Sequence, residues 1–260
     1  MVAGGTPLFI QTRHNGYVPR LTNFTAAITS KTKAIVINTP NNPTGTVYDR
    51  DTLADIGQLA IDRNLWIIFD ECYGAFTQTP HTHHPIVSVA PQARAWTLIV
   101  NSFSKSVAPT DWRVGYLAGP KAVISAVKAL QGHTTSNSNV IAQQAVLRHL
   151  EAGDTAFQLQ LQCRVANARA LGLSILSALT SVPQPATQGG FYFYLDLTEL
   201  QRRTKVGDRE LNADDVVSAL LIDANVATVS STAFGDPAGV RLSYGIYLEL
   251  AKARGVSPQL

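Results

Sequence analysis

Cysteine, charge and long hydrophobic runs are all scarce in this chain of 260 residues. The two cysteines, Cys72 and Cys163, lie far apart in the sequence, which favours reduced thiols over a disulfide framework. Only 15% of the residues are Asp, Glu, Lys or Arg, whereas 45% are apolar. This composition excludes a disordered or coiled-coil protein and indicates a sizeable hydrophobic core.

The sequence also lacks signals for a membrane or for nucleic acid. No apolar stretch approaches the ~20 residues of a membrane span, and the N-terminal stretch MVAGGTPLFI has neither the charged region nor the long apolar region of a signal peptide. Basic residues are scattered and the net charge is only +3. We therefore expect a soluble, cytoplasmic protein that binds neither nucleic acid nor a membrane.

The first half of the chain alternates apolar runs with amphipathic stretches. Residues 49–63 have the apolar spacing of a helix, and buried-looking strands are predicted at 34–38, 65–70, 97–102 and 114–119. Continuous apolar strands indicate a sheet covered on both faces, and the strand–helix–strand order indicates parallel pairing. The fourth strand follows the third too closely for a helical crossover, so we expect it to be antiparallel.

The second half has a different character. The pattern is helical from residue 121, and a long amphipathic stretch over 154–180 leads to strands at 189–197 and 240–248 and a helix at 212–224. The whole pattern predicts an α/β fold with a mostly parallel sheet flanked by helices. We expect a large domain at residues 1–153 and a smaller α+β domain at 154–260.

Polar side chains gather where the first three predicted strands end. Because the carboxyl ends of parallel strands meet at one sheet edge, and ligands bind there, we expect these side chains to converge. They are Asn42, Asp70, Tyr73, Ser102, Ser104 and Lys105, with Arg113 shortly after.

Each of these residues also has an ordinary interpretation. Asn42 suits a turn, Asp70 suits a helix cap, and Lys105 and Arg113 suit a solvated surface. In a partly buried site, however, a lysine is a usable amine for Schiff-base chemistry, and a guanidinium is a natural clamp for phosphate.

Four motifs in this order closely resemble the fold-type I, pyridoxal-phosphate-dependent aminotransferases of class I/II, the aspartate aminotransferase-like superfamily. They are NNPTG at 41–45, DECY at 70–73, SFSK at 102–105 and WRVGY at 112–116. RLSYG at 241–245 is similar to the C-terminal arginine motif of that family. The resemblance covers nearly the whole chain.

The resemblance implies a homodimeric enzyme of amino acid metabolism that moves an amino group between an α-amino acid and a 2-oxo acid. It implies that Lys105 forms the Schiff base with pyridoxal 5′-phosphate and moves the proton at the substrate Cα. Asp70 would pair with the ring nitrogen, and Tyr73 and Asn42 with the ring oxygen. Ser102 and Arg113 would hold the phosphate.

The resemblance also implies how the substrate is held. Arg241 would grip the α-carboxylate of the substrate with Asn42 beside it. No residue is assigned to a metal.

Two features depart from the family pattern. Family members carry a further segment ahead of the residue that is Met1 here, and it supplies a phosphate-binding turn, an aromatic residue stacked on the cofactor and much of the dimer contact. Asp111 stands where the family usually has a small residue. Its carboxylate either competes with phosphate for Arg113 or points to solvent.

Other activities stay open. A lyase or cyclase of the same fold, or a truncated non-catalytic remnant that binds the cofactor, would carry the same motifs. An S-x-x-K acyl-transferase is disfavoured because S-D-N and K-T-G are absent, and a nicotinamide enzyme because no G-x-G-x-x-G follows a strand. The HTHH run at 81–84 predicts a flexible surface loop rather than a metal site, because no cysteine or clear carboxylate set accompanies it.

Overall fold

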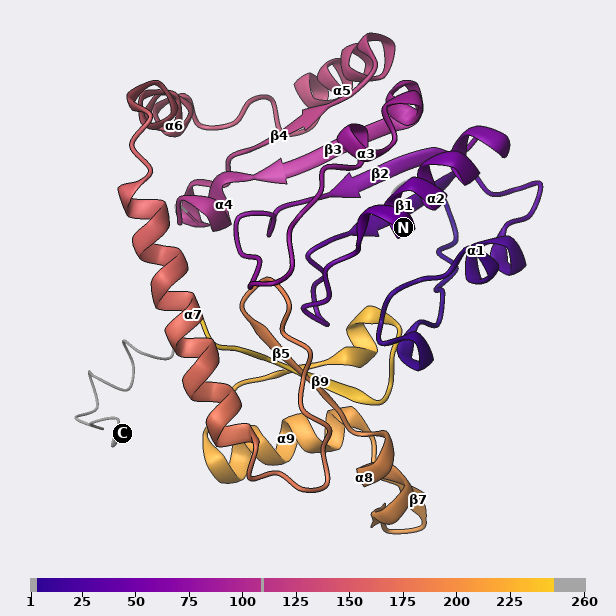
Figure 1. The fold of residues 1–260 in the computed structure, drawn as a ribbon, viewed down its shortest axis with the longest axis vertical. Coiled ribbons are helices and arrows are strands. Elements are labelled where there is room, and N and C mark those ends of the chain that lie inside the picture. Colours follow the sequence, from indigo (N-terminus) through magenta and orange to yellow (C-terminus); the bar gives the residue numbers. More distant parts are fainter. Residues whose placement is uncertain (1–3, 109, 246–260) are drawn as a thin grey trace. The chain divides into compact units, whose positions relative to one another are not determined.

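The chain forms two compact units in a computed structural model that describes residues 4–108 and 110–245 (Figure 1). The first unit comprises residues 1–40 and 47–160, and the second comprises 41–46 and 161–260. The division between these units falls inside a helix, and the loop after the first strand belongs to the second unit. Within the described residues, every helix is too short or too polar to cross a membrane.

A four-stranded sheet organises the first unit, in the order β1-β2-β3-β4 (Figure 1). β1, β2 and β3 are parallel, and β4 is antiparallel to β3. The strands are β1 (Ala34–Asn38), β2 (Trp66–Asp70), β3 (Thr97–Ser102) and β4 (Gly115–Ala118). Both the parallel pairing and the antiparallel fourth strand are confirmed.

Helices connect and flank these strands. They are α1 (Leu21–Ala27), α2 (Arg50–Asp62), α3 (Ile86–Val89), α4 (Phe103–Ser106), α5 (Lys121–His133) and α6 (Val140–Ala152), with 3-10 turns η1 (Arg13–Asn15), η2 (Pro91–Trp96) and η3 (Thr110–Trp112). α2 begins where the side chain of Asp49 accepts a hydrogen bond from the Thr52 N–H at 2.8 Å, which satisfies one unpaired backbone donor of the first turn. Its apolar side chains at helical spacing, among them Leu53 and Ile56, are buried in the core of the first unit.

The core of the first unit lies on one face of the sheet. Alternate strand residues Ile35, Ile37, Ile67 and Phe69 are at most 6% exposed and belong to the same buried cluster as the apolar side of α2. Val36 points to the opposite face and is 69% exposed. The expectation that both faces are covered is therefore wrong for the edge strand β1, because the described residues place no layer over that side chain.

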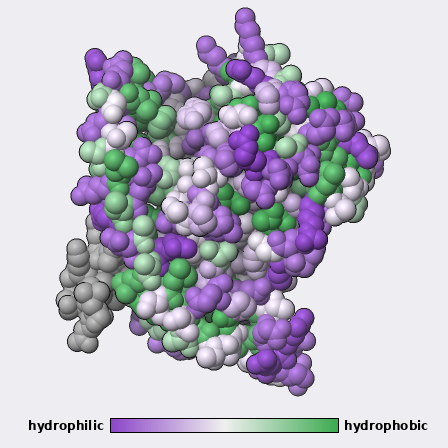
Figure 2. Space-filling model, in the orientation of Figure 1, coloured by the Kyte–Doolittle hydropathy of each residue, from purple (hydrophilic) through white to green (hydrophobic). Residues whose placement is uncertain are grey.

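Apolar side chains are also exposed on the helices that follow β4. On α6 they include Val140, Ile141, Leu147 and Leu150, of which Ile141 is 81% exposed. Figure 2 shows hydrophobic surface over α6 at the upper left of the view. Such a surface is unusual for a helix that faces only water.

The second unit is built on an antiparallel sheet in the order β5-β9-β8. Its elements are β5 (Tyr192–Asp196), α8 (Thr198–Arg203), β6 (Lys205–Val206), β7 (Arg209–Glu210), α9 (Ala213–Ala224), β8 (Val229–Ser230), η4 (Ser231–Phe234) and β9 (Gly239–Ser243), preceded by α7 (Ala156–Leu176). A Cβ at Gly239 would lie 2.2 Å from Tyr194 Oη, so a glycine at this position of β9 leaves room for the phenol ring of Tyr194.

The one-sided core predicts unequal effects of truncating two strand side chains. Ile67→Ala should lower the free energy of unfolding by about 2–5 kcal/mol, because it leaves a cavity at a fully buried position. Val36→Ala on the open face should cost about 1 kcal/mol or less. Urea denaturation followed by circular dichroism measures both; equal losses would contradict a core on one face.

Candidate functional site

Asp70 stands at the carboxyl end of β2, in register with Asn38 of β1 and Val100 of β3. Its backbone carbonyl accepts hydrogen bonds from Asn38 Nδ2 at 3.2 Å and from the Thr39 N–H at 3.1 Å. Its carboxylate accepts one from the Cys72 N–H at 3.0 Å. The neighbouring strand thus fixes the backbone of Asp70, and the turn that follows fixes its side chain.

The pKa of the Cys72 thiol depends on two charged neighbours, Asp70 and Lys105. Burial raises the pKa of Cys72 to about 12, helped by its hydrogen bond to Asp70 and by the charge of that carboxylate. The positive charge of Lys105 acts in the opposite direction. The Lys105 amine therefore lies within electrostatic range of the Asp70–Cys72 turn.

Lys105 is carried by a single helical turn directly after β3. Ser102 ends the strand and caps α4, because its hydroxyl accepts a hydrogen bond from the Ser104 N–H at 3.1 Å. Lys105 Nζ lies 5.9 Å from the ring centroid of Tyr73, whose side chain is buried. The structure thus brings Asp70, Tyr73 and Lys105 together at the carboxyl ends of β2 and β3, as the sequence predicts.

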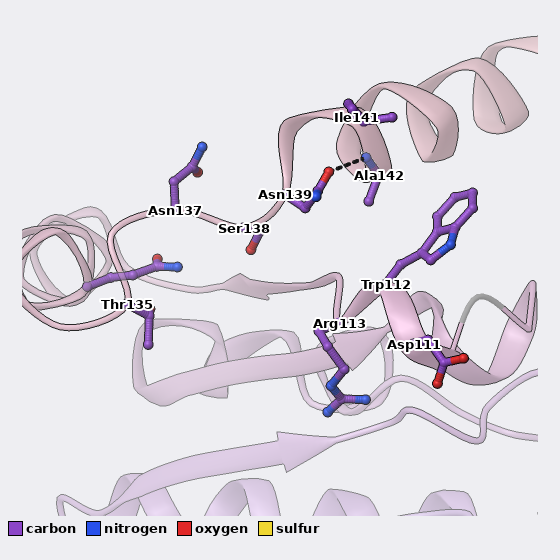
Figure 3. Close-up of a pocket in the computed structure, with 10 residues that line it drawn as sticks. Asp111, Trp112, Arg113, Thr135, Asn137, Ser138, Asn139, Ile141 and Ala142 are labelled. Carbon is purple, nitrogen blue, oxygen red and sulfur yellow. Dashed lines mark hydrogen bonds between the residues drawn. The ribbon is translucent and has the colours of Figure 1, made fainter.

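Arg113 lies in the turn between α4 and β4, with a backbone φ of 55° that is rare for a residue with a side chain. It is exposed, and its Nη1 donates to the carbonyl of Thr110 at 3.1 Å. Figure 3 shows Trp112 extending toward α6 and Arg113 extending the opposite way, along a cavity of about 780 Å³. Within residues 4–108 and 110–245, no ion pair joins Arg113 to Asp111, which is exposed, so of the two alternatives for Asp111 the contacts favour the one in which its carboxylate points to solvent.

Arg241 lies on β9 in the second unit, where aromatic rings surround its guanidinium. The carbon Cζ is 4.5 Å from the ring centroid of Tyr192 and 5.4 Å from that of Phe234. Nη1 donates to Asn42 Oδ1 at 2.8 Å, and the buried Nε has no hydrogen-bond partner. An unpaired buried N–H of a guanidinium leaves a donor for a carboxylate.

Asn42 reaches Arg241 because its loop folds within the second unit. The side chain of Asn41 accepts hydrogen bonds from Thr44 N at 3.2 Å and Thr44 Oγ1 at 2.8 Å. Gly45 has a φ of 71° and would place a Cβ 3.1 Å from the carbonyl oxygen of Gly189. The turn chemistry of NNPTG therefore serves to present the Asn42 amide to Arg241.

The sequence missed one polar contact beside Asp70. His81 is exposed, as expected for the HTHH run, but the side chain of His83 is only 13% exposed and its Nε2 lies 3.1 Å from Glu71 Oε2. The one available signal was Gly74, where a Cβ would lie 2.8 Å from the His83 ring. A glycine alone does not identify its neighbour, so the pair was not predictable.

The hydrogen bond between Asp70 and Cys72 predicts a change in thiol reactivity. With a pKa of about 12, roughly one Cys72 thiol in ten thousand is ionised at pH 8. Asp70→Asn removes a negative charge, so it should lower this pKa and speed alkylation of Cys72 at least about tenfold. Iodoacetamide kinetics in a Cys163→Ser background measure the rate, and Asp62→Asn, at an exposed position, is the control. An unchanged rate would show that Asp70 does not act on the thiol.

Comparison with known proteins places this chain among aminotransferases. Residues 2–251 match the family described as aminotransferase class I and II. The chain is 34% identical over 257 residues to an aspartate aminotransferase of Bacillus sp. (strain YM-2), covering 96% of this chain and 62% of that protein. It is 35% identical to the aspartate aminotransferase of Geobacillus stearothermophilus, covering 95% and 62%.

Solved structures agree. Thermus thermophilus aspartate aminotransferase with maleate superposes with a TM-score of 0.80 at 32% identity, covering 94% of this chain and 61% of that one. The aromatic aminotransferase of Pyrococcus horikoshii gives 0.84 at 25% identity, covering 98% and 70%. The chain spans about three fifths of the length of the curated relatives named above (62% of each). With a match over almost its whole length, the chain belongs to the class I and II aminotransferase family.

Proposed function

We propose that this chain carries the catalytic groups of a pyridoxal-phosphate-dependent aminotransferase, which moves an amino group between an α-amino acid and a 2-oxo acid. The observation that carries the proposal is the meeting of the Lys105 amine, the Asp70 carboxylate and the buried Tyr73 phenol at one sheet edge. The family membership gives these three groups a shared purpose.

The residues present fit the cofactor that members of this family use, pyridoxal 5′-phosphate. The first unit holds an amine for its aldehyde (Lys105), a carboxylate for its ring nitrogen (Asp70) and a phenol for its ring oxygen (Tyr73). Ser102 and Arg113 offer a hydroxyl and a guanidinium for its phosphate. When bound, the cofactor supplies an electron-withdrawing ring that acidifies the Cα–H of an amino acid.

The geometry supports distinct roles for the two central residues. Asp70 is held at its carbonyl by Thr39 and at its carboxylate by Cys72, so it would keep a proton on a ring nitrogen without moving itself. Lys105 sits on a capped turn beside it, which suits an amine that binds the cofactor and then moves a proton at the substrate Cα.

The surroundings of Arg241 support a role in substrate binding. Its guanidinium is oriented by Asn42 and by two aromatic rings, and its Nε–H has no partner. We propose that it binds the α-carboxylate of the amino acid, with Asn42 beside it in the same unit. The curated relatives are named aspartate aminotransferases, which makes aspartate with 2-oxoglutarate the first pair to test.

We also propose a homodimer in the cytoplasm. The exposed apolar side chains of α6 support association, because a face of this kind is stabilised when a second subunit removes it from water. Cys72 and Cys163 are both free thiols, as is usual in a reducing compartment.

Amino-group exchange between aspartate and 2-oxoglutarate is the test of the activity. The parent chain with added cofactor should form oxaloacetate and glutamate in equal amounts, and Lys105→Ala should lower the rate by roughly 10²–10⁴-fold because the base is lost. Lys121→Ala, at an exposed position on α5, is the matched control and should match the parent.

Three other outcomes would contradict this activity. Release of ammonia without a second oxo acid would identify a lyase instead. A chain that binds cofactor without turnover would be a non-catalytic remnant. Full activity in the Lys105→Ala variant would show that another amine carries the cofactor.

Arg241→Lys tests the substrate site. The variant keeps the charge but loses the planar, aromatic-stacked donor set, so KM for the amino acid should rise roughly tenfold to a hundredfold with little change in kcat. Arg209→Lys in the same unit is the control, because Arg209 is exposed and its guanidinium contacts the Asp215 carboxylate and the Glu210 carbonyl. Steady-state kinetics give both constants; an unchanged KM would exclude Arg241 as the carboxylate ligand.

A further inference from the structure

Glu71 and His83 form a largely buried pair next to the turn that carries Asp70. Glu71 Oε2 lies 3.1 Å from His83 Nε2, and the two side chains are 11% and 13% exposed. Because an ionised carboxylate only accepts hydrogen bonds, His83 donates through Nε2 in this pair. The pair joins the loop after β2 back to the end of that strand.

The imidazole ring of His83 is closely packed against Phe69 and Gly74, and we call the space that it fills the His83 slot. It stacks on Phe69 with ring centroids 6.2 Å apart and planes inclined by 22°. A Cβ at residue 74 would lie 2.8 Å from the ring atom Cδ2, so only a glycine there leaves room for the imidazole. The second nitrogen of His83, Nδ1, is buried without a hydrogen-bond partner, which costs stability. An apolar side chain would fill the slot without that cost, so the distinctive contribution of histidine is its bond to Glu71.

Glu71 in turn connects two neighbouring strand ends. Its backbone N–H donates to the carbonyl of Val100 at 3.0 Å, and its Oε1 accepts a hydrogen bond from Asn101 Nδ2 at 3.3 Å. Asn101 Oδ1 accepts one from the Ser102 N–H at 2.7 Å. One set of contacts therefore runs from the residue after Asp70 to the residue that caps the turn of Lys105.

We propose that His83 is a positioning residue, which acts through Glu71 and Asn101 to fix the Asp70 turn relative to the turn that carries Lys105. This inference rests on the proposed function, in which Asp70 and Lys105 hold one cofactor ring. Groups that act on one small molecule must keep their separation to within about 0.5 Å. The pairing of β2 with β3 holds the two strands, and the side-chain contacts of His83, Glu71 and Asn101 extend that link to the turns that follow them.

Cys72 provides a readout that needs no cofactor. Its thiol lies in the Asp70 turn, and burial together with Asp70 raises its pKa, which disfavours the reactive thiolate. If His83 holds this turn, loss of its hydrogen bond should expose the thiol and raise the rate of alkylation in a Cys163→Ser background. His83→Leu, which fills the slot without a donor, should raise the rate at pH 8 at least about tenfold.

Two further variants distinguish loss of the His83–Glu71 hydrogen bond from a general destabilisation of the loop. His83→Gln keeps an N–H donor near the position of Nε2 and should restore the slow rate of the parent chain. His81→Leu changes an exposed histidine of the same loop and should have no effect. Circular dichroism checks that each variant is folded. An unchanged rate in His83→Leu, equal rates in the two leucine variants, or a folded His83→Gln that reacts as fast as His83→Leu would overturn the proposal.

A double-mutant cycle shows whether His83 acts through Glu71. Glu71→Leu should speed alkylation about as much as His83→Leu, and the double variant should add little to either, because both single changes break the same link. Effects that multiply in the double variant would overturn the proposed route. Should His83→Leu fail to fold, Glu71→Leu takes its place, and a thiol as slow as that of the parent in a folded Glu71→Leu variant would overturn the proposal.

Cofactor binding is measured separately in the same variants. His83→Leu should raise the dissociation constant of pyridoxal 5′-phosphate at least about fivefold, followed by absorbance, while His83→Gln stays near the parent. A parent chain that binds no cofactor would overturn the proposed function alone, because the thiol rates still decide whether His83 positions the turn. Normal cofactor binding in a His83→Leu variant with a fast thiol would overturn the link between positioning and the site.

Discussion

The parallel register of β2 and β3 is the constraint on which the first unit's site depends. It sets Asp70 opposite Val100, two residues before Ser102 ends β3, and the backbone bond from Glu71 to Val100 continues the pairing past the end of β2. A slip of one residue would turn Asp70 toward the buried face. The buried alternate residues on that face oppose such a slip, so the hydrophobic core and the placement of the polar groups have one cause.

The second unit uses an antiparallel sheet for a different purpose. β9 holds Arg241 opposite Tyr194, and the loop at 41–46 supplies Asn42 to orient its guanidinium. The loop follows β1 directly in the sequence, yet it folds with the second unit. A short turn rich in Asn, Pro and Gly thus belongs to the unit that presents the arginine, which explains why an asparagine at this point matters for more than turn formation.

The sequence predicted what depends on local pattern and motif order. The strand ranges 34–38 and 97–102 match β1 and β3, and the antiparallel β4 followed from a short connection. It did not predict that Val36 is exposed, because an apolar run shows that a strand favours burial but does not show which residues, if any, cover each face of the sheet. It did not predict the contact of His83 with Glu71 either, because the two residues are 12 positions apart in a loop and no periodicity relates them.

Chemical trapping of the cofactor tests the central claim most directly. The chain is mixed with pyridoxal 5′-phosphate, treated with borohydride and digested, and the peptides are identified by mass spectrometry. Lysines in Schiff-base linkage become permanently labelled by this reduction. The account predicts the label on the peptide that contains Lys105, at an occupancy well above that of exposed lysines such as Lys121. Label spread evenly over surface lysines, or concentrated on another one, would contradict it.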